Sequence, residues 1–98
     1  MLEKQIEKRV CEYAKEMGML VYKFTSPGRV GVPDRMFVCP KGMVFFIEFK
    51  RPGAEPTPPQ IREHERLEAH GLNVFVIDDV TKGKLIVDIM WGKSRAIA

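Results

Sequence analysis

The sequence is poor in cysteine and has no long apolar run, and both features exclude whole classes of protein. Its two cysteines, Cys11 and Cys39, are too far apart for a metal-binding knuckle and fall in apolar segments. We therefore expect buried, reduced thiols and no disulfide framework. No apolar stretch is long enough to span a bilayer, and the first residues do not form a signal peptide. We expect a cytoplasmic protein that is neither secreted nor bound to a membrane.

Repeats and low-complexity linkers are also lacking. The chain has 98 residues, of which 45% are hydrophobic and 30% charged, and this is typical of one globular domain with a modest core. We expect residues 1–98 to form a single domain. Its two histidines, His64 and His70, have no partner at metal-ligand spacing, so we expect them to pack or to end a helix rather than to bind zinc.

Positive charge is unevenly distributed along the chain. The net charge is +3, but residues 22–51 hold six lysines and arginines against two acidic residues, which leaves about −1 for the remainder. Neutralising phosphates releases counterions, so a cluster of basic residues is typical of proteins that bind a polyanion. Solvated loops are often basic as well, and this feature alone leaves both interpretations open.

Apolar periodicity predicts three helices. Residues 3–17 repeat apolar side chains at helical spacing, and Gly18 follows as a helix stop. Residues 57–71 begin with Thr-Pro-Pro-Gln, in which Thr57 caps the helix and Gln60 completes a capping box. Residues 79–98 fit either a helix or a strand, and we favour a helix.

Strands are predicted at residues 19–24, 34–39, 43–50 and 73–78. The second and third form a hairpin with its turn at residues 40–42, and the loop 25–33, with two glycines and two prolines, suits a close approach to a ligand. A helix connects the third and fourth strands, which should therefore be parallel neighbours. The predicted fold class is α/β, in the order αβββαβ, with a mixed central sheet flanked by helices.

Opposite charges share one face of the strand at 43–50. Side chains alternate across a strand, so Glu48 and Lys50 point to one face, whereas Phe49 points to the other. Asp34 begins the preceding strand of the hairpin. Because the start of one antiparallel strand lies against the end of its partner, we expect Asp34, Glu48 and Lys50 to converge.

This cluster has a plain interpretation and a chemical one. Glu48 and Lys50 can form a same-face ion pair worth about 0.2–1 kcal/mol. Alternatively, Asp34, Glu48 and the backbone carbonyl of Phe49 bind Mg²⁺ or Mn²⁺, which prefer oxygen ligands and bind phosphates. Lys50 would then orient or deprotonate an attacking water. We favour this metal-assisted phosphodiester hydrolysis, because the pair follows a Pro-Asp across a hairpin inside the basic segment.

The motifs resemble those of a known nuclease family. "GVPDR", "FFIEFKRPG" and "PPQIREHERL" together resemble the VRR-NUC group (virus-type replication and repair nucleases) of the PD-(D/E)xK nuclease superfamily. The resemblance implies a restriction-endonuclease-like fold, Asp34 and Glu48 as metal ligands, Lys50 as the catalytic lysine and Gln60 as an active-site glutamine. It also implies a metal-dependent DNA endonuclease of a bacterial or phage-infected cell.

Two features of the implied site have alternatives. Gln60 can close the capping box with Thr57, or it can face the metal site, and the roles do not exclude each other. We favour the site, because a helical wheel puts Gln60 on an inward side with Ile61, His64 and Leu67. The family also implies a glutamate on the first helix. Glu3 falls inside the apolar stripe and Glu7 at its edge, so we favour Glu3. The alternative is that Glu3 has no role in the site, because the helix dipole stabilises any carboxylate in the first turn.

Polar residues flank the implied site and are candidates for contacts to DNA phosphates: Lys23, Ser26, Arg29, Arg35 and Arg51. No separate DNA-reading domain is recognisable, so we expect recognition of DNA shape. Small members of the superfamily are similar to junction-resolving enzymes. We expect a homodimer that cuts branched DNA, such as four-way (Holliday) junctions in replication, recombination or repair, with the apolar tail as interface. The alternative is a basic module that binds nucleic acid without cutting it.

Overall fold

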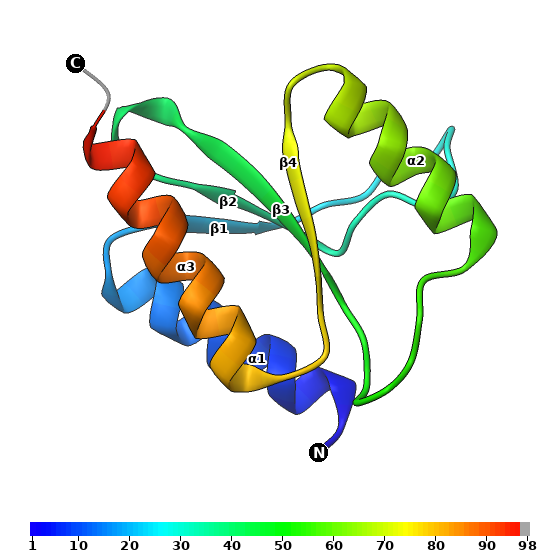
Figure 1. Cartoon of the computed structure of the whole chain (residues 1–98), viewed down its shortest axis with the longest axis horizontal. Helices are drawn as coiled ribbons and strands as arrows, with labels where there is room; N and C mark the ends of the chain where they lie inside the picture. The colour runs from blue at the N-terminus through cyan, green and yellow to red at the C-terminus, as the bar shows by residue number, and fades with distance from the viewer. Residues whose placement is uncertain (97–98) are drawn as a thin grey trace.

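Four strands form one mixed sheet with helices on both of its faces (Figure 1). The computed structural model describes residues 1–96, so residues 97–98 of the predicted domain and tail lie outside the described part. In chain order the elements are α1 (Glu3–Glu16), β1 (Leu20–Lys23), β2 (Arg35–Val38), the 3-10 turn η1 (Pro40–Gly42), β3 (Val44–Phe49), α2 (Pro58–Ala69), β4 (Asn73–Ile77) and α3 (Val80–Arg95). The predicted α/β class is confirmed, and the ambiguous tail is a helix.

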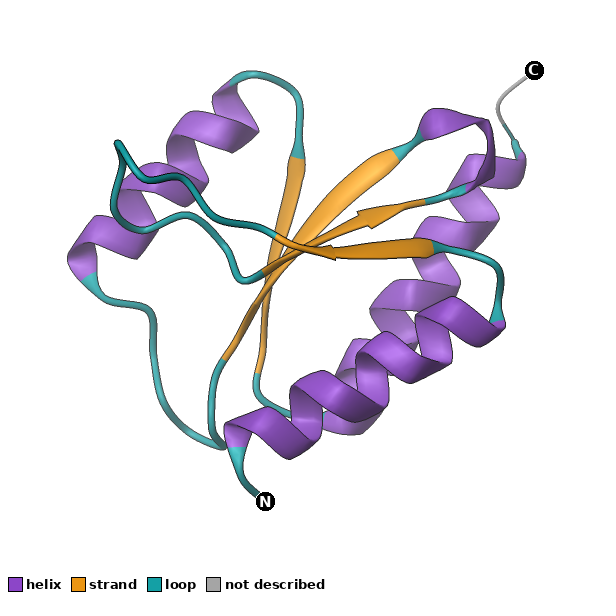
Figure 2. Ribbon diagram, turned by 180° about the vertical axis from the view of Figure 1, so that it is seen from behind, coloured by secondary structure: helices purple, strands orange, loops and turns teal. Residues whose placement is uncertain are grey.

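The strands lie side by side in the order β1-β2-β3-β4. β2 pairs antiparallel with both β1 and β3, whereas β3 and β4 are parallel, as the intervening helix predicted. That helix, α2, lies on one face of the sheet, and α1 and α3 cover the other face (Figure 2). The hairpin between β2 and β3 turns through η1, where Lys41 and Gly42 adopt positive φ angles of 72° and 86°.

Alternating side chains of β3 divide the sheet into a core face and a second face. Phe45, Ile47 and Phe49 are fully buried among apolar residues of α1 and α3. Burial of each such side chain stabilises the fold by about 1.5–3 kcal/mol. Because successive side chains point to opposite faces, this packing directs Glu48 away from the core and towards the α2 side of the sheet.

α1 and α3 approach each other closely at Gly83. A Cβ atom at this position would lie 2.5 Å from Val10 Cγ2 and 3.2 Å from Ile77 Cγ2. Val10 is fully buried and Ile77 nearly so, so neither side chain has free space to move into. The absence of a side chain at Gly83 therefore permits the packing of the two helices.

Most other predictions about the fold are confirmed, and one is wrong. Cys11 and Cys39 are buried and free. The helical wheel put Ile61 and His64 on the inward side of α2. His64 is buried as predicted, together with Glu63, but Ile61 is 46% exposed. Within residues 1–96, no helix combines the length and the apolar character needed to cross a membrane.

The close contact at Gly83 predicts opposite effects for two substitutions in α3. Gly83→Ala should lower the free energy of unfolding by about 1–3 kcal/mol, because the added methyl group overpacks the core. Gly92 lies in the same helix, and a Cβ atom at this position would have no neighbour within 4 Å. Gly92→Ala should therefore raise the free energy of unfolding by about 0.5–1 kcal/mol. Urea unfolding of both variants measures the difference. Equal effects of the two substitutions would contradict the proposed packing.

Candidate active site

Asp34 is held at the end of the sheet by backbone groups on two sides. Its Oδ2 accepts a hydrogen bond of 2.7 Å from the N–H of Phe49, and its carbonyl oxygen accepts one of 2.9 Å from the N–H of Phe24. The register of β2 and β3 pairs Arg35 with Ile47, which brings Asp34 level with Glu48. The expected meeting of one strand's start with its partner's end is therefore observed.

Glu48 is the most deeply buried acidic residue of the site, with 2% of its surface exposed. Its Oε2 accepts a hydrogen bond of 3.2 Å from Gln60 Nε2 and lies 3.7 Å from Lys50 Nζ. Its Oε1 has no hydrogen-bond partner within residues 1–96 and lies 3.8 Å from His64 Nε2, which likewise has none. One oxygen of a buried carboxylate is thus left without a donor.

Gln60 connects the start of α2 to the charged groups of β3. Its Oε1 accepts hydrogen bonds from Lys50 Nζ (2.7 Å) and from the backbone N–H of Thr57 (2.9 Å). Its own backbone N–H donates to Thr57 Oγ1 at 3.4 Å. The capping box and the contact with the site therefore coexist in a single side chain.

Asp34 disfavours the ionisation of Glu48, and both carboxyl groups have a raised pKa. Burial raises the pKa of Glu48 to about 8; the nearby charge of Asp34 adds to this shift and the charge of Lys50 opposes it. Burial is also the main reason why the pKa of Asp34 is raised, although the hydrogen bond from Phe49 acts in the opposite direction. With both groups ionised, the site holds more negative charge than its single lysine compensates.

The two glutamates proposed on α1 both affect the carboxyl groups of the site, since the charge of Glu3 contributes to the raised pKa of Glu48. Glu7 is partly buried, its Oε2 accepts a hydrogen bond of 2.6 Å from Arg35 Nε, and its charge contributes to the raised pKa of Asp34. Glu3 is exposed, so its expected place in the apolar stripe is wrong. The buried stripe of α1 begins with Ile6, one turn further into the helix.

The five residues proposed to contact DNA differ in exposure and in pairing. Lys23 and Arg51 are exposed, and Ser26 is partly buried. Arg35 is paired with Glu7, and Arg29 lies 3.4 Å from Glu63, an acidic residue of α2 that is itself only 6% exposed. Two of the five candidates are therefore paired with acidic side chains.

Comparisons with known proteins found a similar phage protein and a similar solved structure. No family model matches the chain. Over 76 residues it is 50% identical to the "Putative nuclease p44" of Acyrthosiphon pisum secondary endosymbiont phage 1, a match that covers 78% of this chain and 82% of that protein. A solved structure described as a VRR_NUC domain is 34% identical, with a TM-score of 0.81, over 88% of this chain and 94% of the other.

The chain belongs to the VRR-NUC family of nuclease domains. The resemblance inferred from the three sequence motifs is thereby confirmed, and so is the restriction-endonuclease-like fold that it implied. A nuclease can use buried charged groups in its reaction, whereas an ordinary ion pair on a sheet does not need to be buried.

The donor set of this VRR-NUC domain fits a hard divalent cation. Asp34 and Glu48 supply carboxylate oxygens, one of which has no hydrogen-bond donor, and a cation between them would relieve the excess negative charge. Within residues 1–96 no three histidine, cysteine or acidic side chains converge as a complete metal cage. Mg²⁺ commonly binds through one or two protein carboxylates and completes its shell with water and substrate oxygens. The carboxylates of Asp34 and Glu48 are therefore enough to hold it.

His64 is the residue of this site that the sequence analysis missed. It was expected to be packed, and it is, with 6% of its surface exposed, but it packs against Glu48 rather than against the apolar core. Burial lowers its pKa, which favours the neutral ring. The helical wheel places His64 on the same side of α2 as Gln60, but it does not show that the ring lies next to Glu48.

The raised pKa of Glu48 predicts a stability penalty in EDTA. The folded protein holds the proton up to about pH 8 whereas the unfolded chain releases it near 4.5, so the free energy of unfolding should fall as pH rises between these values. Glu48→Gln should remove much of that slope and raise stability at pH 8 by about 1–3 kcal/mol. Urea unfolding across this pH range measures the effect.

Glu65→Gln is the matched control, because Glu65 is a fully separate, exposed glutamate on α2. It should leave the pH dependence unchanged. A Glu48→Gln protein that is as sensitive to pH as the wild type would show that Glu48 does not carry the penalty.

Proposed function

We propose that this VRR-NUC domain is a Mg²⁺- or Mn²⁺-dependent deoxyribonuclease, with residues 1–98 acting as one domain that hydrolyses phosphodiester bonds. The observation that carries the proposal is the buried contact set of Glu48, Lys50 and Gln60 beside Asp34. A surface ion pair would need neither the burial of Glu48 nor a second carboxylate next to it. In a metal-assisted hydrolase both have a use, because the two carboxylates can bind the ion together.

Asp34 and Glu48 would hold the metal, with the carbonyl oxygen of Phe49 as a further ligand. The bound ion would stabilise negative charge that develops on the phosphate and help to generate the nucleophile. The hydrogen bond from the Phe49 N–H orients Asp34. The hydrogen bond from Gln60 to Glu48 Oε2 leaves Oε1 without a donor and available to a ligand.

Lys50 is the proposed catalytic lysine. Only 13% of its side chain is exposed, and Gln60 Oε1 accepts one of its three N–H bonds. The remaining donors can orient a water molecule and stabilise charge on the phosphate oxygens. Gln60 is a positioning residue in this scheme, because it holds Lys50 and Glu48 at the same time.

Branched DNA is the proposed substrate, and a homodimer is the proposed active form. A two-fold dimer would present two active sites to the symmetric arms of a four-way junction, whose shape it could recognise without reading base sequence. Leu85 and Ile89, four residues apart on α3, are 56% and 44% exposed and support the apolar tail as the interface. A monomeric mass in sedimentation at assay concentrations would exclude this assembly.

Lys23, Ser26 and Arg51 remain proposed contacts to DNA phosphates, as do Arg29 and Arg35 through the donors that their acidic partners leave free. The competing hypothesis, a basic module that binds nucleic acid without cutting it, has no such use for a buried carboxylate with a second one beside it. The two hypotheses make different predictions for one assay.

Replacing Lys50 should abolish cleavage and preserve binding. We expect Lys50→Ala to cut at least about 100-fold more slowly, because a positioned cation at the reacting phosphate is lost. Purified protein is incubated with labelled four-way junction, flap and linear duplex in Mg²⁺, Mn²⁺ or EDTA, and DNA binding is measured in EDTA. Lys93→Ala is the control, since Lys93 is exposed on α3.

Folded wild-type protein that binds but never cuts would support the non-catalytic module, and cutting that survives Lys50→Ala would indicate a contaminant.

The same assay distinguishes the two glutamates of α1. Glu7→Gln should slow cleavage by about tenfold or more, because the variant loses both the charge next to Asp34 and the pairing that holds Arg35. Glu3→Gln should change the rate less than about twofold, since Glu3 is exposed in the first turn. The reverse order of effects would restore Glu3 as the glutamate of the site.

A further inference from the structure

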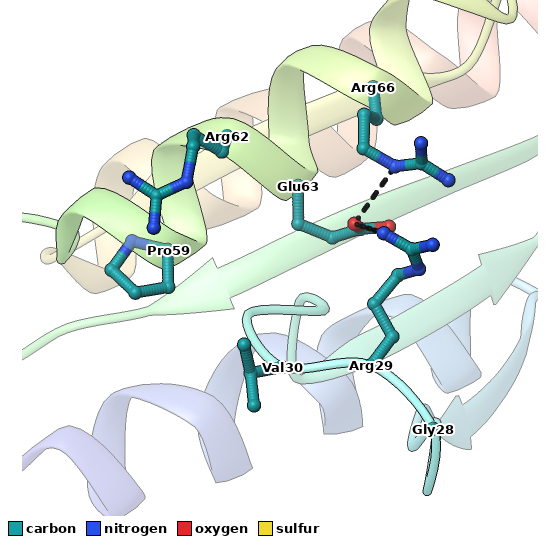
Figure 3. Close-up of a pocket in the computed structure, with 7 residues that line it drawn as sticks. All are labelled: Gly28, Arg29, Val30, Pro59, Arg62, Glu63 and Arg66. Atoms are coloured by element: carbon teal, nitrogen blue, oxygen red, sulfur yellow. Dashed lines mark hydrogen bonds and ion pairs between the residues drawn. The ribbon is translucent and has the colours of Figure 1, made fainter.

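An open pocket lined by three arginines lies beside the proposed active site. It has a volume of about 420 Å³ and is formed between α2 and the loop before β2 (Figure 3). Its charged lining residues are Arg29 from the loop and Arg62, Glu63 and Arg66 from α2. Three cationic groups against one carboxylate give the pocket an excess of positive charge.

Glu63 holds two of the arginines in place. The residue is only 6% exposed, and its Oε1 accepts a hydrogen bond from Arg66 Nε at 3.2 Å and one from Arg29 Nη1 at 3.4 Å. Figure 3 shows the two guanidinium groups converging on this one carboxylate. Each guanidinium has five N–H donors, so the contact with Glu63 orients both arginines and leaves most of their donors unused.

Arg62 is the third cation, and it has no such partner. Within residues 1–96 its guanidinium group makes no hydrogen bond or ion pair, and the side chain lies beside Pro59 at the rim of the pocket (Figure 3). The side chain of Arg62 therefore does not help to attach the loop to α2. It is exposed and can bind a ligand in the pocket.

The pocket is built on the same two segments as the proposed active site. The loop that carries Arg29 leads to Asp34, and α2 carries Gln60, three residues and about 4.5 Å along the helix from Glu63. The loop is seated tightly on the start of α2. A Cβ atom at Gly31, whose φ is +86°, would lie 2.5 Å from the carbonyl oxygen of Pro59. The pocket and the site are therefore held in a fixed relation.

We propose that Arg29, Arg62 and Arg66 form a binding site for a phosphate group of the substrate, next to the phosphate that is cut. Guanidinium groups match the oxygens of a phosphate with paired hydrogen bonds, and a nucleic-acid strand carries a phosphate about every 3.4 Å along the duplex axis. A strand that reaches Asp34 and Glu48 thus has further phosphates within reach of the pocket. The inference rests on the proposed function for the identity of the ligand.

The first test uses inorganic phosphate as the probe and needs no catalysis. The Nε–Hε resonance of Arg62, assigned by its loss in Arg62→Gln, should shift on titration of wild-type protein with phosphate. The resonance of Arg95, which is exposed on α3 across the sheet, should not. An Arg62 resonance that stays unchanged would count against a phosphate site.

The second test measures DNA binding in EDTA as a function of salt. Arg62→Gln should weaken binding on the order of tenfold near 0.1 M salt and reduce the slope of log K against log salt by about 1, because one phosphate contact is lost. Arg95→Gln is the matched control and should change the affinity less than about twofold. Arg66→Gln should act in the same direction as Arg62→Gln.

Oligonucleotides with 5′-hydroxyl, 5′-phosphate or 3′-phosphate ends identify the source of the phosphate. Equal weakening of all three by Arg62→Gln assigns an internal backbone phosphate. A gain in wild-type affinity from one terminal phosphate, absent in Arg62→Gln, assigns a strand end. Unchanged affinity and salt slope in both Arg62→Gln and Arg66→Gln, with no phosphate shift at Arg62, would overturn the proposal.

Failure of this proposal and failure of the proposed function give different results. If Lys50 is not catalytic or no DNA is cut, binding in EDTA still depends on Arg62 and the pocket stands. If Arg62→Gln binds and cuts as the wild type does, the nuclease stands and the pocket does not.

Discussion

The burial of Glu48 next to Asp34 is the constraint on which the site depends. A carboxylate with almost no exposed surface disfavours its own ionisation, and a second carboxylate beside it increases the penalty. Such a pair persists because the surrounding structure holds it: β3 is anchored by Phe45, Ile47 and Phe49 on its core face. The apolar packing of one face of the strand thus supports an electrostatically unfavourable arrangement on the other.

α2 contributes to folding and to the site through the same residue. Thr57 and Gln60 close the N-terminal turn of the helix, and such a cap is worth about 1 kcal/mol. The amide of Gln60 then has one oxygen shared between a backbone N–H and Lys50, and its NH₂ group donates to Glu48. A helix that begins at a different residue would misplace the contact with Lys50, so local capping and the geometry of the site are coupled.

The sequence was sufficient for those features that depend on one strand or one turn. Alternation along β3 separates Glu48 from Phe49, and hairpin pairing brings Asp34 to Glu48. Both features follow from the two-residue period of a strand and from the order of the strands along the chain. Contacts that depend on how a helix docks were not predictable in this way. The helical wheel places His64 on the inward side of α2, but its contact with Glu48 depends on where α2 docks over the parallel pair β3 and β4. Glu3 is exposed because the buried stripe of α1 begins one turn later, at Ile6. Which of Glu3 and Glu7 acts in the site stays a prediction.

The distribution of charge in space differs from its distribution along the chain. Residues 22–51 carry the positive excess in the sequence, yet Arg35 and Arg29 from that segment are paired in the structure with Glu7 and Glu63 from elsewhere. Arg62 and Arg66 come from the part of the chain whose net charge is negative, and they complete a positive pocket with Arg29. Because each ion pair removes part of the field of its arginine, the affinity of a surface for phosphate depends on which cations keep free donors. A binding surface in this protein is therefore assembled by the docking of α2 against the loop before β2, and not by a basic stretch of sequence.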